Sequence, residues 1–260
     1  MLDESLIRTL HVEALRGHDL HEGREPHVLF QASTIGALLD GAYEGDVTIG
    51  ELGEHGDLGL GTLNGIDGEM IAVDGRFYRA DVGGTINEID PTERTPFAVV
   101  LPFTPTVSAS AEQELPHDDL LAWLDGLAPA GGGALALRLD GEFSRVRARS
   151  VPKQHPPYRP LAEVIADQHV FELGALSGTI VGFRFPAYTE GIEVNGYHLH
   201  FISDDRSRGG HVLECTFAAG TAAIDLSSDL HVELPAGVSL DSPELSSAAH
   251  EAVERIEHSG

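Results

Sequence analysis

Apolar and polar residues alternate along much of this chain, and this pattern favours β-strands over helices. Two alternating stretches flank Asp74-Gly75 and two more flank Asp140-Gly141, a residue pair favoured in two-residue type I′ turns. Asn195-Gly196 separates two further stretches in the same way. Three such turns predict three β-hairpins in a chain dominated by antiparallel strands.

Helices are expected at only a few places. Ser33 is the expected cap of a short helix over residues 34–39, which Asp40-Gly41 ends. A second helix is expected over about residues 160–169, opened by its proline, and a third begins at Ser242-Pro243-Glu244.

The run APAGGG, residues 128–133, is the best linker candidate and divides the chain into two parts of similar size. We therefore expect an α/β chain of the α+β type, with two mostly antiparallel or mixed β-sheet domains and a few helices. The expected parts are a leader at 1–26, an N-terminal β-rich domain at 27–130, and a C-terminal β-rich domain at 134–260 that ends in a helix.

Glycine is unusually frequent from Gly50 to Met70, in GELGEHGDLGLGTLNGIDGEM. This stretch has neither the Gly-Lys-Ser/Thr ending nor the strand–loop–helix frame of a phosphate loop, so no nucleotide site is expected. We expect these glycines to allow tight backbone turns close to a ligand.

The composition narrows the possible partners and locations. A formal net charge of −26 argues against binding nucleic acid or anionic lipid, because both are polyanions. No apolar run approaches the roughly 20 residues that cross a bilayer, and the N-terminus does not resemble a secretory signal. With Cys215 as its sole cysteine, the chain needs no oxidising compartment. We expect a soluble cytoplasmic protein.

The acidic surface also contains few lysines, since Lys153 is the only one. Such a composition is typical of proteins in a high-salt interior, where screening weakens self-repulsion. A source with GC-rich codons produces the same bias, and the sequence leaves both origins open.

Candidate chemistry concentrates in YHLHFISDDRSRGGHVLECTF, residues 197–217. Alternate residues of a strand share a face, so His198 and His200 point the same way, roughly 6.6 Å apart. If the polar loop DDRSRGG closes a hairpin, His211 lies beside His200 on the neighbouring strand. Three imidazoles can then meet about 2.0–2.1 Å from one metal ion and leave positions for water or substrate.

The same residues allow plainer interpretations. A strand histidine is usually a surface or core residue, and an HxH pair arises by chance in a chain with 14 histidines. Three imidazoles suit zinc, but iron, copper, nickel or cobalt ions accept the same ligands. By alternation Cys215 shares a face with His211, and we expect it to be a small buried core residue rather than a ligand.

Together with several other segments, these residues resemble the α-acetolactate decarboxylase family. The matching segments are VLFQASTIGALLDGAYEGD, GDLGLGTLNGIDGEM, TPFAVV, RARSVPKQ with PYRPL, GTIVGF and YHLHFISDDRSRGGHVL. The resemblance implies a zinc-dependent carboxy-lyase that converts 2-acetolactate to (R)-acetoin and carbon dioxide, with the metal site between the two domains. We expect 2-acetolactate as the small-molecule partner, and a homodimer.

The resemblance also assigns roles to individual residues. His198, His200 and His211 become the metal ligands. Glu69, in the DGE motif, and Glu257, near the C-terminus, are implied to approach the metal, and either could supply a proton to the product.

The placement of Glu257 agrees with helix geometry. Glu257 follows Val253 by four residues on the expected last helix, so it borders the apolar stripe of that helix. Glu254 and Glu251 are rival positions for the same role.

Two further roles come from the resemblance alone. Arg149, in RARSVPKQ, is implied to bind the substrate carboxylate, and Thr62, in GLGT, is implied to lie in the active site. Arg145, Arg147 and Arg149 share one strand face, so periodicity by itself predicts a row of solvated arginines.

Two other functions fit the histidines: a three-histidine metal oxygenase of the cupin type and a non-catalytic acidic metal-binding protein. Cupins are all-β barrels with a glycine-and-histidine first motif. They have no equivalent of the DGE or RARSVPKQ segments, which argues against the first alternative.

Overall fold

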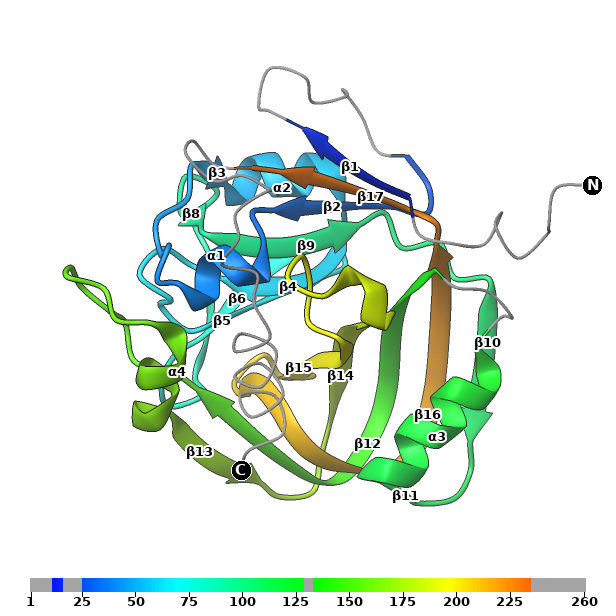
Figure 1. The fold of residues 1–260 in the computed structure, drawn as a ribbon. Helices are drawn as coiled ribbons and strands as arrows, with labels where there is room; N and C mark the ends of the chain where they lie inside the picture. Colours follow the sequence, from blue (N-terminus) through cyan, green and yellow to red (C-terminus); the bar gives the residue numbers. More distant parts are fainter. Residues whose placement is uncertain (1–10, 16–24, 129–132, 235–260) are drawn as a thin grey trace, which may run out of the picture.

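The computed structural model describes residues 11–15, 25–128 and 133–234, in which two β-sheets pack against each other (Figure 1). The first sheet has eight strands in the order β1 (His11–Leu15), β17 (Asp229–Glu233), β2 (Val28–Ala32), β9 (Phe97–Leu101), β4 (Leu58–Thr62), β5 (Glu69–Val73), β6 (Arg76–Ala80) and β7 (Ile86–Glu88). The second follows the path β10 (Val107–Ala111), β16 (Gly209–Ser227), β15 (Gly196–Ser203), β14 (Leu176–Phe185), β12 (Ala134–Ser150) and β13 (His169–Leu173), with β11 (Leu115–Pro116) paired to β16. A small third sheet pairs β3 (Val47–Thr48) with β8 (Arg94–Thr95).

Most strand pairs are antiparallel. The exceptions among the described strands are β1–β17 and β17–β2, which are parallel. Strand β12 pairs with β16 as well as with β14, so β12, β14, β15 and β16 close a ring. One mixed and one antiparallel sheet, with few helices, confirm the predicted fold class.

Each of the two large sheets contains strands from both sides of the APAGGG run. Strand β17 follows that run and joins the first sheet, whereas β10 and β11 precede it and join the second. A division into independently folding domains stays a prediction.

The core has several parts. Between the sheets, Leu60 and Ile71 of the first pack with Phe183 and Ile202 of the second. Helix α2 (Ile49–His55) packs on the other face of the first sheet, and α3 (His117–Leu127) packs on the second. Helices α1 (Ile35–Leu39) and α4 (Leu161–Val164) share a further apolar cluster, which forms part of the pocket described below.

One of the three predicted hairpin turns is present. Asp74 and Gly75 have φ angles of 54° and 73° and join β5 to β6, as a type I′ turn requires. The prediction at Asp140-Gly141 is wrong, because both residues lie inside β12. A side chain at Gly141 would stand 2.2 Å from the carbonyl oxygen of Ala219, so this glycine serves close strand packing.

The prediction at Asn195-Gly196 is also wrong. Gly196 begins β15, and the preceding strand β14, which pairs with β15, ends at Phe185. A ten-residue connection, 186–195, that contains the 3-10 helix η3 (Ala187–Thr189) therefore replaces a two-residue turn.

Two predicted helices are present at the expected places, but their caps or lengths differ from the prediction. Thr34, not Ser33, caps α1, because its side chain accepts a hydrogen bond from the Ala37 N–H. The helix after Pro160 is α4 followed by the 3-10 helix η2 (Ile165–Asp167), and β13 begins at His169. The helix expected from Ser242 lies outside the described residues.

Helices α2 and α3 were not predicted. A capping box marks the start of α2, where the Thr48 and Glu51 side chains each bond the other's backbone N–H. That Thr-x-x-Glu signal was readable in the sequence, but the glycines around it indicated turns instead.

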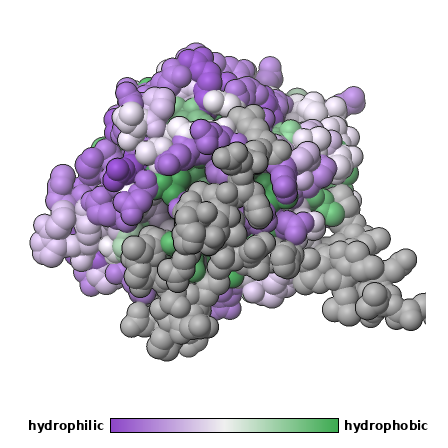
Figure 2. Space-filling model, turned by 90° about the horizontal axis from the view of Figure 1, so that it is seen from above, coloured by the Kyte–Doolittle hydropathy of each residue, from purple (hydrophilic) through white to green (hydrophobic). Residues whose placement is uncertain are grey.

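The face shown in Figure 2 is largely hydrophilic where the described residues form it, in keeping with the net charge of −26. In the described part of the chain, no helix is both long and apolar enough to cross a membrane.

Candidate metal centre and its pocket

Three histidines converge from two neighbouring strands of the second sheet. His198 and His200 lie on β15, and His200 pairs with His211 on β16, so the hairpin predicted from the sequence is confirmed. The ring centroids are 5.1–5.3 Å apart. One nitrogen from each ring lies within 4.8 Å of the others, and the exposed fractions of the three residues are 7%, 1% and 2%.

The surroundings of His200 prepare it as a ligand. Its Nδ1 lies 2.8 Å from the Met70 carbonyl oxygen, which can only accept, so Nδ1 carries the proton and Nε2 presents its lone pair. Burial is the main cause that holds the pKa of His200 well below its usual range, with further lowering by His211 and Arg149, so the ring is neutral near pH 7.

The Nε2 atom of His200 is buried, and among the described residues it has no hydrogen-bond partner. A buried acceptor in that condition is costly unless something binds it. The arrangement fits a divalent metal ion held by three neutral imidazoles, with the backbone carbonyl of Met70 orienting one of them.

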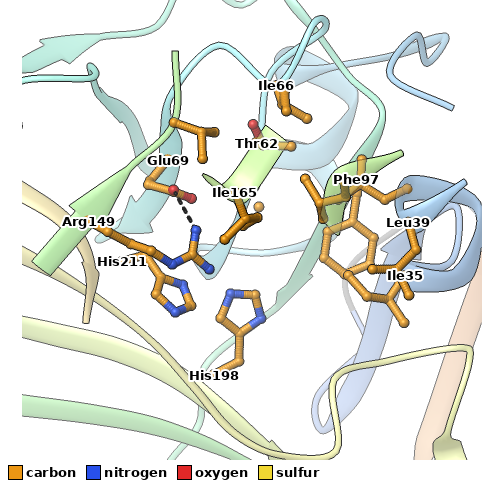
Figure 3. A pocket seen from close by; sticks show the side chains of 14 residues that line it. Ile35, Leu39, Thr62, Ile66, Glu69, Phe97, Arg149, Ile165, His198 and His211 are labelled. Atoms are coloured by element: carbon orange, nitrogen blue, oxygen red, sulfur yellow. Dashed lines mark ion pairs between the residues drawn. The ribbon is translucent and has the colours of Figure 1, made fainter. Parts of the chain in front are cut away.

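Glu69 and Arg149 face each other across this site from different sheets (Figure 3). Glu69 is the first residue of β5, and Arg149 lies near the end of β12, paired with His211. Arg149 Nη1 is 3.7 Å from Glu69 Oε1, and His200 Nε2 is 3.6 Å from Glu69 Oε2. Arg149 is 5% exposed and Glu69 is 7% exposed.

Arg149 is buried while Arg145 is exposed, although β12 pairs with β13 in unbroken register from Val146 to Ser150. The two arginines differ in what packs against them. Arg145 pairs with the exposed carboxylates of Glu172 and Glu214, whereas Arg149 faces the buried Glu69 of the first sheet, so the solvated arginine row suggested by periodicity does not extend to Arg149.

Thr62 lies directly across from Glu69 on β4. Its hydroxyl donates a hydrogen bond of 2.7 Å to the Gly68 carbonyl, which fixes the connection between the two strands. Thr62 also lines the pocket.

The pocket joins these polar groups to an apolar wall. His198, His211, Glu69, Arg149 and Thr62 lie on its polar side. The apolar lining residues are Ile35, Leu38, Leu39, Ile66, Phe97, Val151, Leu161 and Ile165. Sequence reasoning missed this wall, because apolar residues on short helices and strands look alike whether they line a pocket or a closed core.

The remaining sequence predictions for this site concern Cys215 and Glu257. Cys215 is buried in the core, as predicted, at 1% exposed. It packs in the same cluster as Val212, because the extra residue Leu213 shifts the register of β16, so the expectation that it shares a face with His211 is wrong. Glu257, with its rivals Glu251 and Glu254, lies outside the described residues.

Comparison with known proteins gives a consistent result. The family profile described as alpha-acetolactate decarboxylase matches residues 29–247. The α-acetolactate decarboxylase of Methylococcus capsulatus is 42% identical over 259 residues, which cover 99% of each chain. The Bacillus subtilis strain 168 protein of that name is 38% identical over 80% of this chain and 81% of its own. Its crystal structure superposes with a TM-score of 0.84 at 36% identity, over 89% of this chain and all of that one.

Proposed function

The chain belongs to the α-acetolactate decarboxylase family and decarboxylates 2-acetolactate, and we propose that it does so at a divalent metal ion held by His198, His200 and His211. The observation that carries this proposal is the buried histidine triad, with Glu69 and Arg149 beside it in one pocket.

Zinc is the ion that we propose. Three neutral nitrogen ligands with room for substrate are typical of catalytic zinc sites, although other divalent transition metals accept the same ligands. When bound, such an ion supplies Lewis acidity that stabilises negative charge on substrate oxygens.

Arg149 is proposed to bind the carboxylate that departs. Its planar guanidinium can donate two parallel hydrogen bonds to a carboxylate, and burial removes competition from water. The contact orients the carbon–carbon bond that breaks and loosens as carbon dioxide forms. The electron pair of that bond passes toward the neighbouring ketone.

Glu69 is proposed to donate the proton that completes the reaction. The intermediate must gain one proton on carbon to become acetoin, and a fixed carboxylic acid delivers it to a single face. We therefore expect one enantiomer, (R)-acetoin. Glu257 stays a proposal as the second carboxylate, and the homodimer and the cytoplasmic location stay predictions.

Neither alternative function is favoured by these findings. A cupin-type oxygenase would not need Arg149 and Glu69 as a pair opposite the histidines, and a non-catalytic metal-binding protein would not need the pocket.

The test is to incubate the purified protein with racemic 2-acetolactate and to record acetoin, carbon dioxide and dissolved oxygen together. We expect equal amounts of acetoin and carbon dioxide with no oxygen consumed. Oxygen consumption would support the oxygenase instead, and the absence of any product would support the non-catalytic alternative.

A further inference from the structure

Ile66 adopts a backbone conformation that is unusual for its residue type. It lies on the 63–68 connection between β4 and β5, with a φ angle of 47°. Five non-glycine residues in the described part of the chain have positive φ, and Ile66 is the only β-branched one among them. A branched side chain crowds the backbone in this left-handed region. Such strain persists only where the surroundings impose it, and it clusters at functional sites.

Backbone hydrogen bonds hold this connection from two sides. The Gly65 N–H donates to the Tyr43 carbonyl, and the Gly65 carbonyl accepts from the Gln154 N–H, both at 2.7 Å. The Asn64 side chain accepts from the Gly45 N–H at 2.9 Å and donates to the Gly45 carbonyl at 3.0 Å. The connection is therefore fixed to segments before β3 and after β12.

A charged cluster ties the connection to the same places. The Asp67 carboxylate oxygen Oδ2 accepts hydrogen bonds from Arg79 of β6 and from Lys153, the only lysine of the chain, each at 3.0 Å. Lys153 lies four residues after Arg149 and next to Gln154. These contacts keep the backbone of Ile66 in place relative to both Glu69 and Arg149.

The side chain of Ile66 forms part of the pocket wall. It lines the pocket beside Thr62 (Figure 3) and is 2% exposed. If Arg149 holds the substrate carboxylate and the histidine side faces the substrate oxygens, the alkyl groups of the substrate remain for the apolar wall. One of them is the methyl group on C2, the carbon that loses the carboxylate.

We propose that Ile66 sets the length of the C2 alkyl group that the pocket admits. The inference rests on the decarboxylase function proposed above. Other wall residues, such as Ile165 on η2, lie on ordinary helical or extended backbone, where an apolar side chain causes no strain. Ile66 is branched and apolar despite this backbone strain. The hydrogen bonds of its connection hold it in place, so Ile66 cannot easily shift to admit a bulkier substrate.

The experiment matches a methylene removed from the wall with a methylene added to the substrate. The substrates are racemic 2-acetolactate and its homologue with an ethyl group in place of the C2 methyl. The measured quantity is the ratio of kcat/KM for the ethyl substrate to that for the methyl substrate. Ile66→Val should raise this ratio about tenfold, since one methylene in an apolar pocket is worth at least that much.

Ile66→Met keeps the number of side-chain heavy atoms but reaches one atom further from the backbone, so it should lower the ratio. It also gives a second measurement if Ile66→Val fails to fold, which circular dichroism and thermal unfolding detect. One control removes the same methylene outside the pocket: Ile180→Val, buried in the second sheet. It should leave the ratio within about twofold of wild type, and Ile165→Val in the wall should raise the ratio less than Ile66→Val does.

An unchanged ratio in the folded Ile66 variants, or an equal rise in Ile165→Val, would overturn the assignment to Ile66. Wild-type protein without activity on 2-acetolactate would instead remove the proposed function, so the two failures are distinguishable.

Discussion

Arg149 carries a guanidinium that is almost fully buried, at 5% exposed, with the carboxylate of Glu69 3.7 Å away. If it holds the substrate carboxylate, Arg149→Ala should keep its bound metal and lose kcat/KM by roughly 100-fold or more. Arg149→Lys should recover little, because an ammonium group cannot form the two parallel hydrogen bonds. Steady-state kinetics and metal analysis of both variants check this. Near wild-type turnover in Arg149→Ala would exclude the role.

Glu69 is tested by a change that keeps its shape. Glu69→Gln removes the titrating proton, so a proton donor should lose turnover by roughly 10²–10⁴-fold or lose stereochemical control. A residue that served only as a metal ligand would mainly lose metal. Chiral chromatography of the acetoin and metal analysis distinguish the two, with the exposed Glu88→Gln as matched control. Unchanged rate, enantiomer and metal content would remove Glu69 from the mechanism.

The thiol of Cys215 should be unreactive in the folded protein. Burial, with a smaller effect of Glu214, raises the pKa of its thiol to about 12, so roughly one molecule in 10⁴ is a thiolate at pH 8. A thiol reagent should therefore label no cysteine in native protein at pH 8 and one per chain after denaturation. Rapid labelling of native protein would show that the thiol is accessible.

The sequence predicted these residues unequally well. The histidines followed from spacing, because alternation and a polar loop are local properties of one hairpin. Arg149 could not be selected by periodicity, because Arg145, Arg147 and Arg149 alternate alike along β12 and only the approach of Glu69 from the first sheet distinguishes Arg149. Ile66 looked like one apolar residue among many, because its positive φ depends on contacts from distant segments.

Strand β12 illustrates the same limit for an element. Asp140-Gly141 and Asp74-Gly75 are the same dipeptide, yet only the second is a turn. What distinguishes them is packing: β12 passes between β14 and β16, where Gly141 lies opposite Gly178 and Gly220. A local turn preference is weaker than the burial of a long central strand.

Gly141 therefore should not tolerate a side chain. A Cβ atom there would lie 2.2 Å from the Ala219 carbonyl oxygen and 2.8 Å from the Gly220 Cα, so Gly141→Ala should lower the free energy of unfolding by about 1–3 kcal/mol. Gly126→Ala is the matched control, because Gly126 is exposed in α3 with no atom within 4 Å of the added Cβ. It should raise stability by up to about 1 kcal/mol. Thermal unfolding measures both; equal Tm values would contradict the packing argument.

For the whole molecule, the site depends on how the two sheets meet. Glu69 and Thr62 come from the first sheet, and Arg149 and the histidines come from the second. Local patterns indicated antiparallel sheets and a hairpin, but not that β17 would join the first sheet. Long-range pairing of that kind depends on the packing of the complete chain rather than on any one segment.

The metal requirement is tested by measuring acetoin and bound metal in the same samples before chelation, after chelation and after zinc is restored. We expect close to one equivalent of metal per chain, acetoin formation that is lost with the ion, and recovery of both on addition of zinc. Cys215→Ser should behave as wild type, and His200→Ala should recover neither. Full acetoin formation by protein shown to contain no metal would contradict a reaction at His198, His200 and His211.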